Sequence, residues 1–165
     1  MPLNRYALKL EQTLDPRAIY LIKDILHRVT QEGTARSLKD RFDVQLAGKT
    51  GTSDDLRDSW FAGFSENHLA VVWVGRDDNQ ATGLTGASGA LKIWSRLMKA
   101  LPLESIRHEL PENMELHWID IKTGGLTTKA CEGAVELPFV KGSAPEEWAD
   151  CNSGAGMQWL KKIFQ

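Results

Sequence analysis

The sequence predicts an α+β fold in which antiparallel strands pack against helices. Two segments carry apolar residues at three- and four-residue spacing, and the stretch between them holds short runs typical of strands. The chain has 165 residues, of which 42% are hydrophobic and 25% are charged. These proportions are those of an ordinary globular chain, so they exclude disordered and collagen-like proteins.

The first helix is predicted over residues 16–32. Asp15 can cap it, and Pro16 is tolerated at the first helical position because its missing N–H would have no partner there. Gly33 ends the pattern. Its apolar side is formed by Ile19, Ile22, Leu26 and Val29.

Three strands should follow, over residues 44–52, 59–64 and 69–75. The first alternates in polarity, whereas the other two are aromatic and β-branched. Only four residues, 65–68, separate the second strand from the third, which favours an antiparallel hairpin. The continuous apolarity of these two strands suggests that both of their faces are buried.

A second amphipathic helix is predicted from Ser88 to Leu101, and Pro102 closes it. Three antiparallel strands between two helices give one layer of helix on one sheet. We therefore assign residues 1–104 to one structural unit.

Residues 105–165 differ in character, and we interpret them as a C-terminal appendage. A short strand is expected over residues 116–121 and a turn over 122–125, whereas 130–150 is rich in Gly, Pro and Ser. Residues 157–164 have the spacing of a terminal amphipathic helix. That helix can dock on the chain itself or bind a partner, and the sequence leaves both alternatives open.

Charge and hydropathy exclude several classes of function. The formal net charge is -2, so no wide positive field would attract nucleic acid. The longest apolar run, residues 69–75, is far below the roughly 20 residues needed to cross a bilayer. The first residues also lack the apolar core of an export signal. We expect neither a membrane span nor a signal within this sequence.

The segment with chemical information is Ala47-Gly48-Lys49-Thr50-Gly51-Thr52-Ser53. Glycine within a strand marks a place where a ligand or another backbone approaches closely. Lys49, Thr50 and Thr52 offer a positive charge and two hydroxyls to an anion. Alternation places Lys49 and Thr50 on opposite faces, so both serve one cleft only if this strand is a sheet edge. The alternative is a simple turn with a solvated lysine.

The order of segments around this tripeptide resembles the transpeptidase domain of bifunctional, class A penicillin-binding proteins. Besides Lys49-Thr50-Gly51, the resemblance rests on Asp15-Pro16-Arg17-Ala18, Gly33-Thr34-Ala35-Arg36 and Asp58-Ser59-Trp60-Phe61-Ala62-Gly63-Phe64. It covers residues 1–101 with specific motifs and the tail more loosely. It implies the C-terminal part of the fold shared by penicillin-binding transpeptidases and β-lactamases.

The resemblance implies acyl transfer through a serine ester on D-alanyl-D-alanine stem peptides of peptidoglycan. Lys49 would help proton transfer near the nucleophile, and the hydroxyls of Thr50 and Thr52 would hold the substrate carboxylate. The N–H of Thr52 would stabilise the oxyanion. Gly51 would let the substrate backbone approach. Lys49 and Thr52 are thus the expected catalytic residues, with Thr50, Gly51 and Thr52 binding substrate.

The sequence departs from the family in lacking a nucleophile. Family members carry a Ser-x-x-Lys motif and a Ser-x-Asn motif before K-T-G, and none of the nine serines here has lysine three positions later. Ser65-Glu66-Asn67 follows K-T-G in a predicted turn, and Lys122-Thr123-Gly124 is a second K-T-G in another turn. We interpret both as chance matches, and we expect the chain alone to be catalytically inactive.

No cofactor or metal is implied, since the four histidines lack ligand spacing and two acidic turns, around Asp54 and Asp77, are expected to be solvated. The family implies the periplasmic face of the inner membrane, where Cys131 and Cys151 would form a disulfide. Implied partners are stem peptides, β-lactams, the missing N-terminal part of the domain and regulators of wall synthesis. Two alternatives remain: a fragment of a serine β-lactamase or D,D-carboxypeptidase, and an assembly module.

Overall fold

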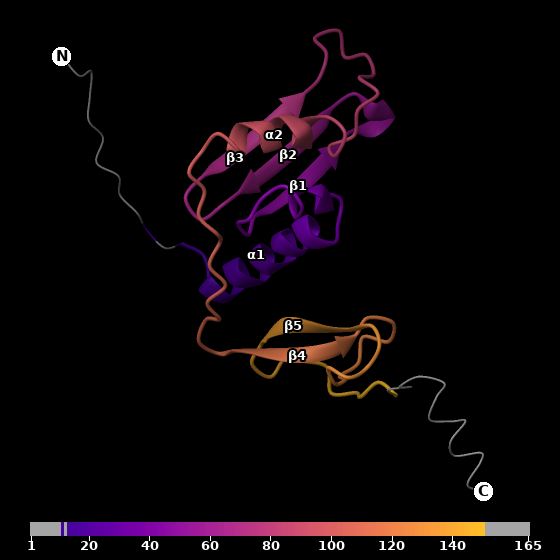
Figure 1. Cartoon of the computed structure of the whole chain (residues 1–165). Helices are drawn as coiled ribbons and strands as arrows, with labels where there is room; N and C mark the ends of the chain where they lie inside the picture. Colours follow the sequence, from indigo (N-terminus) through magenta and orange to yellow (C-terminus); the bar gives the residue numbers. More distant parts are fainter. Residues whose placement is uncertain (1–10, 12, 151–165) are drawn as a thin grey trace, which may run out of the picture.

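A computed structural model describes residue 11 and residues 13–150 (Figure 1). Their elements are helix α1 (Pro16–Gln31), a 3₁₀ turn η1 (Arg36–Leu38), strand β1 (Ala47–Thr52), a 3₁₀ turn η2 (Asp54–Leu56), strands β2 (Ser59–Phe64) and β3 (Leu69–Val74), helix α2 (Ala90–Met98), and strands β4 (Met114–Asp120) and β5 (Ala134–Val140). The predicted α+β class is confirmed.

Helix α1 begins and ends as the sequence predicts, to within one residue. The Asp15 carboxylate accepts a hydrogen bond from the Arg17 backbone N–H at 2.8 Å, and Pro16 occupies the first turn. The Arg17 guanidinium also bonds this carboxylate and lowers its pKa to about 2. The contact with Arg17 therefore favours the ionised form of the cap.

Strands β1, β2 and β3 form an antiparallel sheet in that order. The predicted hairpin is confirmed, but β1 begins at Ala47 and not at residue 44. The reason is that the preceding residues bond to other parts of the chain. The Leu46 carbonyl accepts from the Thr30 hydroxyl at 2.8 Å, and the Gln45 carbonyl accepts from the Ile106 N–H at 3.1 Å.

The core lies between α2 and one face of the sheet. Phe61 of β2 and Trp94 of α2 are fully buried with their rings edge-on, and the Trp94 indole N–H donates to the Ala70 carbonyl at 3.0 Å. Side chains from the loop after α1 complete this layer. The buried cluster contains Ala35, Leu38, Leu46, Phe61, Ala90, Leu91, Trp94 and Met98.

The opposite face of the sheet is exposed, so the prediction that β2 and β3 are buried on both faces is wrong for the described residues. Burial alternates along both strands, as in a sheet with one covered face. Trp60, Leu69, Val71 and Trp73 are between 44% and 73% exposed. The apolar runs are continuous because their outer residues are apolar too, although no described element covers them.

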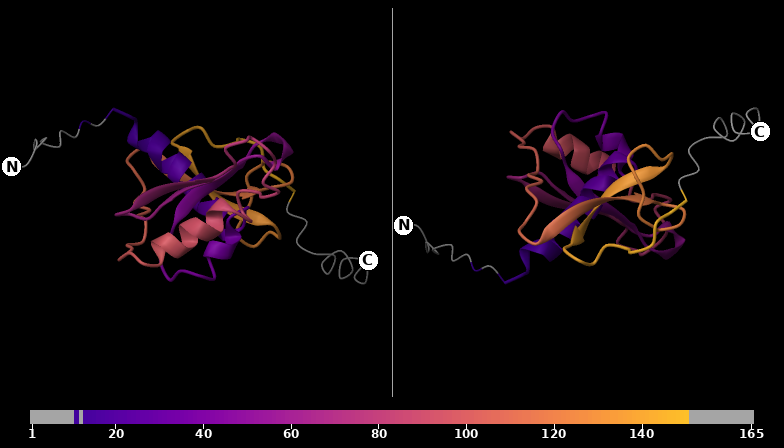
Figure 2. Two further views of the ribbon diagram at one scale, coloured as in Figure 1. Left: turned by 90° about the horizontal axis from the view of Figure 1, so that it is seen from above. Right: turned by 90° about the horizontal axis from the view of Figure 1, so that it is seen from below.

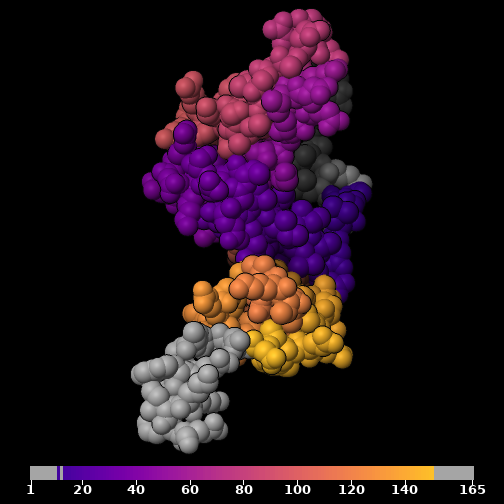
Figure 3. Space-filling view, turned by 90° about the vertical axis from the view of Figure 1, so that its right-hand side faces the viewer, coloured from indigo at the N-terminus to yellow at the C-terminus, as the bar shows by residue number. Residues whose placement is uncertain are grey.

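Strands β4 and β5 form a separate antiparallel hairpin beside α1 (Figures 1 and 3). Viewed from below, this hairpin lies nearest the viewer (Figure 2, right). The sequence predicts β4 but misses β5, which includes Pro138. Proline is tolerated because β4 is the only partner of β5 among the described strands, so one side of β5 needs no ladder hydrogen bond. The Arg28 guanidinium donates to the Glu136 carbonyl at 2.6 Å and joins α1 to β5.

The described helices include none long and apolar enough to cross a membrane. The predicted terminal helix at 157–164 lies outside the described residues. The two sheets fall within residues 1–104 and 105–165, and the boundary between these units stays a prediction.

Candidate functional site

The tripeptide Lys49-Thr50-Gly51 lies in β1, at the edge of the three-stranded sheet (Figure 1). Among the described strands β1 pairs only with β2, so its second edge, called the open edge below, carries no described strand, although α1 packs beside β1. Thr50 is opposite the buried Phe61 and Lys49 is opposite the exposed Ala62. The two side chains therefore flank the open edge from opposite faces. In this arrangement both can serve one cleft, as the sequence analysis expected for a strand at a sheet edge.

Lys49 is exposed, and its ammonium group donates to the Thr50 carbonyl at 2.8 Å. None of the described acidic side chains forms an ion pair with it. Its charge is therefore not neutralised within the described chain, and it can attract an anion that approaches the edge of β1.

The Thr50 hydroxyl is held by a residue from another part of the chain. Its oxygen lies 2.7 Å from the hydroxyl oxygen of Thr34, in the loop that follows α1. A hydroxyl can donate one hydrogen bond and accept others, so this contact fixes the orientation of Thr50 and leaves capacity for a ligand. Thr34 thus positions one of the predicted substrate-binding groups.

The Thr52 hydroxyl is held by Gly86, whose N–H donates to it at 3.0 Å. Gly86 is buried against β1 and β2. A Cβ at this position would lie 2.6 Å from the Trp60 carbonyl oxygen, 2.7 Å from that of Gly51 and 2.8 Å from the Thr50 Cβ. Only glycine lets the loop before α2 approach the strand this closely.

Sequence reasoning identified the β1 residues but not the roles of Thr34 and Gly86. Thr34 belongs to the Gly-Thr-Ala-Arg motif used for the family resemblance, which could have marked it. Gly86 lies in the small-residue run Thr85-Gly86-Ala87-Ser88-Gly89, a weak signal of close backbone packing. Neither contact follows from spacing, because 16 and 34 residues separate the partners.

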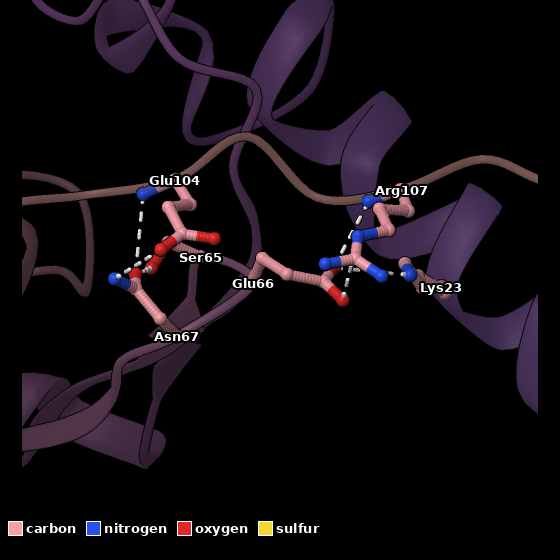
Figure 4. Close-up of polar contacts among 6 residues, drawn as sticks. All are labelled: Lys23, Ser65, Glu66, Asn67, Glu104 and Arg107. Atoms are coloured by element: carbon pink, nitrogen blue, oxygen red, sulfur yellow. Dashed lines mark hydrogen bonds and ion pairs between the residues drawn. The ribbon is translucent and has the colours of Figure 1, made fainter.

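The Ser-x-Asn match at residues 65–67 forms the turn between β2 and β3, as predicted. The Ser65 hydroxyl donates to the Asn67 side-chain oxygen at 2.9 Å (Figure 4). The Asn67 amide donates to the Pro102 carbonyl at 2.9 Å. The sheet register puts this turn beside the beginning of β1, whereas Thr52 ends that strand. Five residues of strand, about 17 Å, separate the ends, so Ser65 does not approach the K-T-G hydroxyls.

Glu66 in the same turn ties together three segments (Figure 4). Its carboxylate accepts from the Arg107 backbone N–H at 3.0 Å and lies 3.7 Å from the Lys23 ammonium of α1. The backbone hydrogen bond is the main cause that lowers the pKa of Glu66 below its usual value, and the two cations add to the effect. The turn therefore anchors the connection that leads to β4.

The second K-T-G, residues 122–124, is a turn as predicted. The Gly124 N–H donates to the Asp120 carbonyl at 2.8 Å, and Gly124 has a positive φ of 75°. No group of three metal-ligating residues occurs among the described residues.

Structural contacts also account for Asp58 of the first acidic turn, which accepts from the Trp73 indole N–H at 2.8 Å. Two histidines meet at α1, where the rings of His27 and His108 lie 4.8 Å apart. Burial is the main cause that lowers the pKa of His108, and His27 adds to it.

Cys131 is buried, and the described residues contain no free cysteine. Cys151 lies outside the described residues, so the disulfide between Cys131 and Cys151 stays a prediction.

Comparisons with known proteins match this chain to penicillin-binding proteins, while no family model matches it. Penicillin-binding protein 1B of Vibrio cholerae is 35% identical over 158 residues, covering 95% of this chain and 20% of that protein. Penicillin-binding protein 1B of Haemophilus influenzae is 39% identical over 116 residues, covering 70% of this chain and 15% of that protein. Penicillin-binding protein 1A of Aquifex aeolicus is 41% identical over 145 residues, covering 82% of this chain and 19% of that protein.

The fold agrees with these matches. The crystal structure of penicillin-binding protein 1A from Haemophilus influenzae superposes with a TM-score of 0.70 over 83% of this chain and 22% of that one, at 24% identity. The resemblance inferred from the motifs, to class A penicillin-binding proteins and to penicillin-binding protein 1B among them, is confirmed. The chain thus belongs to the class A penicillin-binding proteins, and it spans about a fifth of the length of the relatives named here.

Proposed function

We propose that this chain supplies the K-T-G wall of a peptidoglycan D,D-transpeptidase site and not its serine nucleophile. The supporting observation is the placement of Lys49, Thr50 and Thr52 along the open edge of β1, with both hydroxyls held by other loops. The likeness to penicillin-binding proteins supports a role in cell-wall synthesis.

In the proposed reaction a serine hydroxyl from outside this chain attacks the carbonyl of the D-alanyl-D-alanine bond. The serine gives up its proton, the C–O bond of an ester forms, and the amine of D-alanine leaves with a proton. An amine of a second stem peptide then attacks the ester and regenerates the serine. The positive charge of Lys49 would stabilise the developing negative charge and assist proton transfer.

Substrate would add alongside β1 as an extended strand. The hydroxyls of Thr50 and Thr52 would bind its terminal carboxylate, and Gly51 would leave room for its backbone. The N–H of Thr52 would be one of two oxyanion donors, and one such donor contributes about 2.7–4 kcal/mol to the transition state.

The chain alone should be inactive because no serine has the Ser-x-x-Lys context of the family. We expect no covalent band when the purified, folded 165-residue chain is incubated with a fluorescent penicillin. A native penicillin-binding protein serves as the positive control for labelling. A stoichiometric band on the isolated chain would overturn the missing-nucleophile proposal.

The role of Lys49 is testable in a polypeptide that joins this chain to a segment with Ser-x-x-Lys and Ser-x-Asn. Lys49→Ala should slow acylation by about 100-fold or more, the usual scale for losing a proton-transfer group. Lys122→Ala is the matched control, because it removes a lysine from the second K-T-G. Equal rates for Lys49→Ala and the control would contradict the assignment.

A β-lactamase or D,D-carboxypeptidase would use the same wall but hydrolyse the acyl-enzyme. The same joined polypeptide distinguishes these activities. A transpeptidase should keep its β-lactam adduct for many turnover times, whereas rapid release of hydrolysed β-lactam would favour the rival.

The second candidate function is an assembly module formed by the β4–β5 hairpin and the segment after it, supported by the exposed apolar side chains Leu116, Ile121 and Trp148. The proposed partners are regulators of wall synthesis at the periplasmic face of the inner membrane. A truncation that tests this should be made after Leu110 and not closer to α2. Ile106 is buried and bonds to Gln45, so an earlier cut would disturb the first sheet.

A further inference from the structure

A pocket of about 490 Å³ lies between the loop that follows α1 and the first turns of α2. Arg36 and Arg41 line it from the loop, and Lys92 lines it from α2. No aspartate or glutamate is among its lining residues. Three exposed residues with positive charges therefore border one cavity in a chain whose formal net charge is -2.

These three cations lack acidic partners within the described part of the chain. The ion pairs found there involve other residues, such as Arg28 with Asp24 and Arg76 with Asp78. Like charges brought to one site repel one another, and a bound anion removes that repulsion. The pocket thus has the charge of an anion site that no described residue neutralises.

The remaining lining gives the size and chemistry of the ligand. The Ser37 hydroxyl borders the pocket and can donate to an anion, while Leu91, which is only 2% exposed, supplies an apolar wall. The volume exceeds that of a single phosphate or carboxylate and falls in the range of pockets that hold small organic ligands.

We propose that this pocket binds a short peptide segment with two or more carboxylates, which face Arg36, Arg41 and Lys92. The site is separate from the edge of β1, since Lys49 and Thr52 do not line it. Thr34 is shared, because it lines the pocket and contacts Thr50. The proposal does not depend on transpeptidase chemistry, so it can fail or succeed independently of the function proposed above.

The test is a titration of the ¹⁵N-labelled chain at low salt, followed by amide chemical shifts. The probe is the blocked dipeptide N-acetyl-Glu-Glu-amide, and the neutral control is N-acetyl-Gln-Gln-amide. The dianion should shift amides of residues 33–41 and 85–92 in a saturable way, and the neutral peptide should not. Absence of saturable shifts in these two segments would overturn the proposal.

Variants distinguish a built site from general attraction. Arg41→Gln and Lys92→Gln should each weaken binding about five- to tenfold, which is the scale of a partly exposed charge-assisted hydrogen bond. Arg96→Gln is the control, because it removes a charge from the last turn of α2 outside the pocket. Equal weakening by all three would overturn the proposal. Inorganic phosphate that binds the same amides as tightly as the dipeptide would also overturn the assignment to a peptide.

Discussion

Replacement of Gly86 by alanine tests how the loop before α2 holds the K-T-G strand. The added Cβ would lie 2.6–2.8 Å from two carbonyl oxygens and the Thr50 Cβ, all of them main chain or close to it. These atoms cannot rotate away, so the loop or β1 must shift. Overpacking of this kind costs about 1–3 kcal/mol.

A smaller, opposing effect on the unfolded chain reduces the expected loss of stability. Gly86 does not have a positive φ, and a Gly→Ala change at such a position stabilises by about 0.4–1 kcal/mol through the unfolded chain. The net loss in the free energy of unfolding should lie between about 0 and 2.6 kcal/mol, with about 1.3 kcal/mol at the centre of these ranges. Urea denaturation followed by tryptophan fluorescence measures it, and the midpoint should fall without a large change in slope.

Gly83→Ala is the matched control in the same loop. A Cβ there meets nothing within 4 Å, but φ is +70°, so only the backbone conformation is penalised, by about 1 kcal/mol. Amide shifts of Thr50 and Thr52 should change in Gly86→Ala and not in the control. A Gly86→Ala chain that is as stable as the original, or more stable, would refute the argument from close packing.

Three further predictions concern single contacts. Thr34→Val should cost no more than about 1 kcal/mol, because the lost hydrogen bond is exposed, yet it should slow acylation in a joined polypeptide by freeing the Thr50 hydroxyl. Because the pKa of Glu66 is lowered in the fold, its contribution to stability is present above the ordinary value of 4.5 and is lost as pH falls through the folded value. The Arg107 amide shift should follow that titration, and Glu66→Gln should abolish it. The pKa of His108 is also lowered, so the folded chain should lose stability as pH falls from 7.5 to 5.5; His108→Gln should flatten this dependence of the urea midpoint.

Local patterns were sufficient for α1, for the β2–β3 hairpin and for the presence of α2, because each has a cap, a turn or an apolar stripe within its own sequence. Helix α2, Ala90–Met98, is shorter at both ends than the predicted helix over 88–101. They were not sufficient for the limits of β1 or for β5. Leu46 and Gln45 leave the ladder to bond with Thr30 and Ile106, which are distant in sequence. Pro138 argues against a strand unless its neighbours in space are known.

Burial was the larger error. A run such as residues 69–74 is apolar at every position, and alone it cannot distinguish a strand covered on both faces from one covered on a single face. The fold decides this, because α2 covers one side and no described element covers the other.

By itself the sequence determined the α+β class, the family resemblance and the absence of a Ser-x-x-Lys motif from the chain, and it predicted the site strand with Lys49, Thr50 and Thr52. These are properties of residue identity and short-range spacing. The tertiary structure alone decided that β1 is a sheet edge, that Thr34 and Gly86 hold its hydroxyls, and that three cations face one pocket. Each of these depends on segments that are far apart in the chain, and only packing brings those segments together.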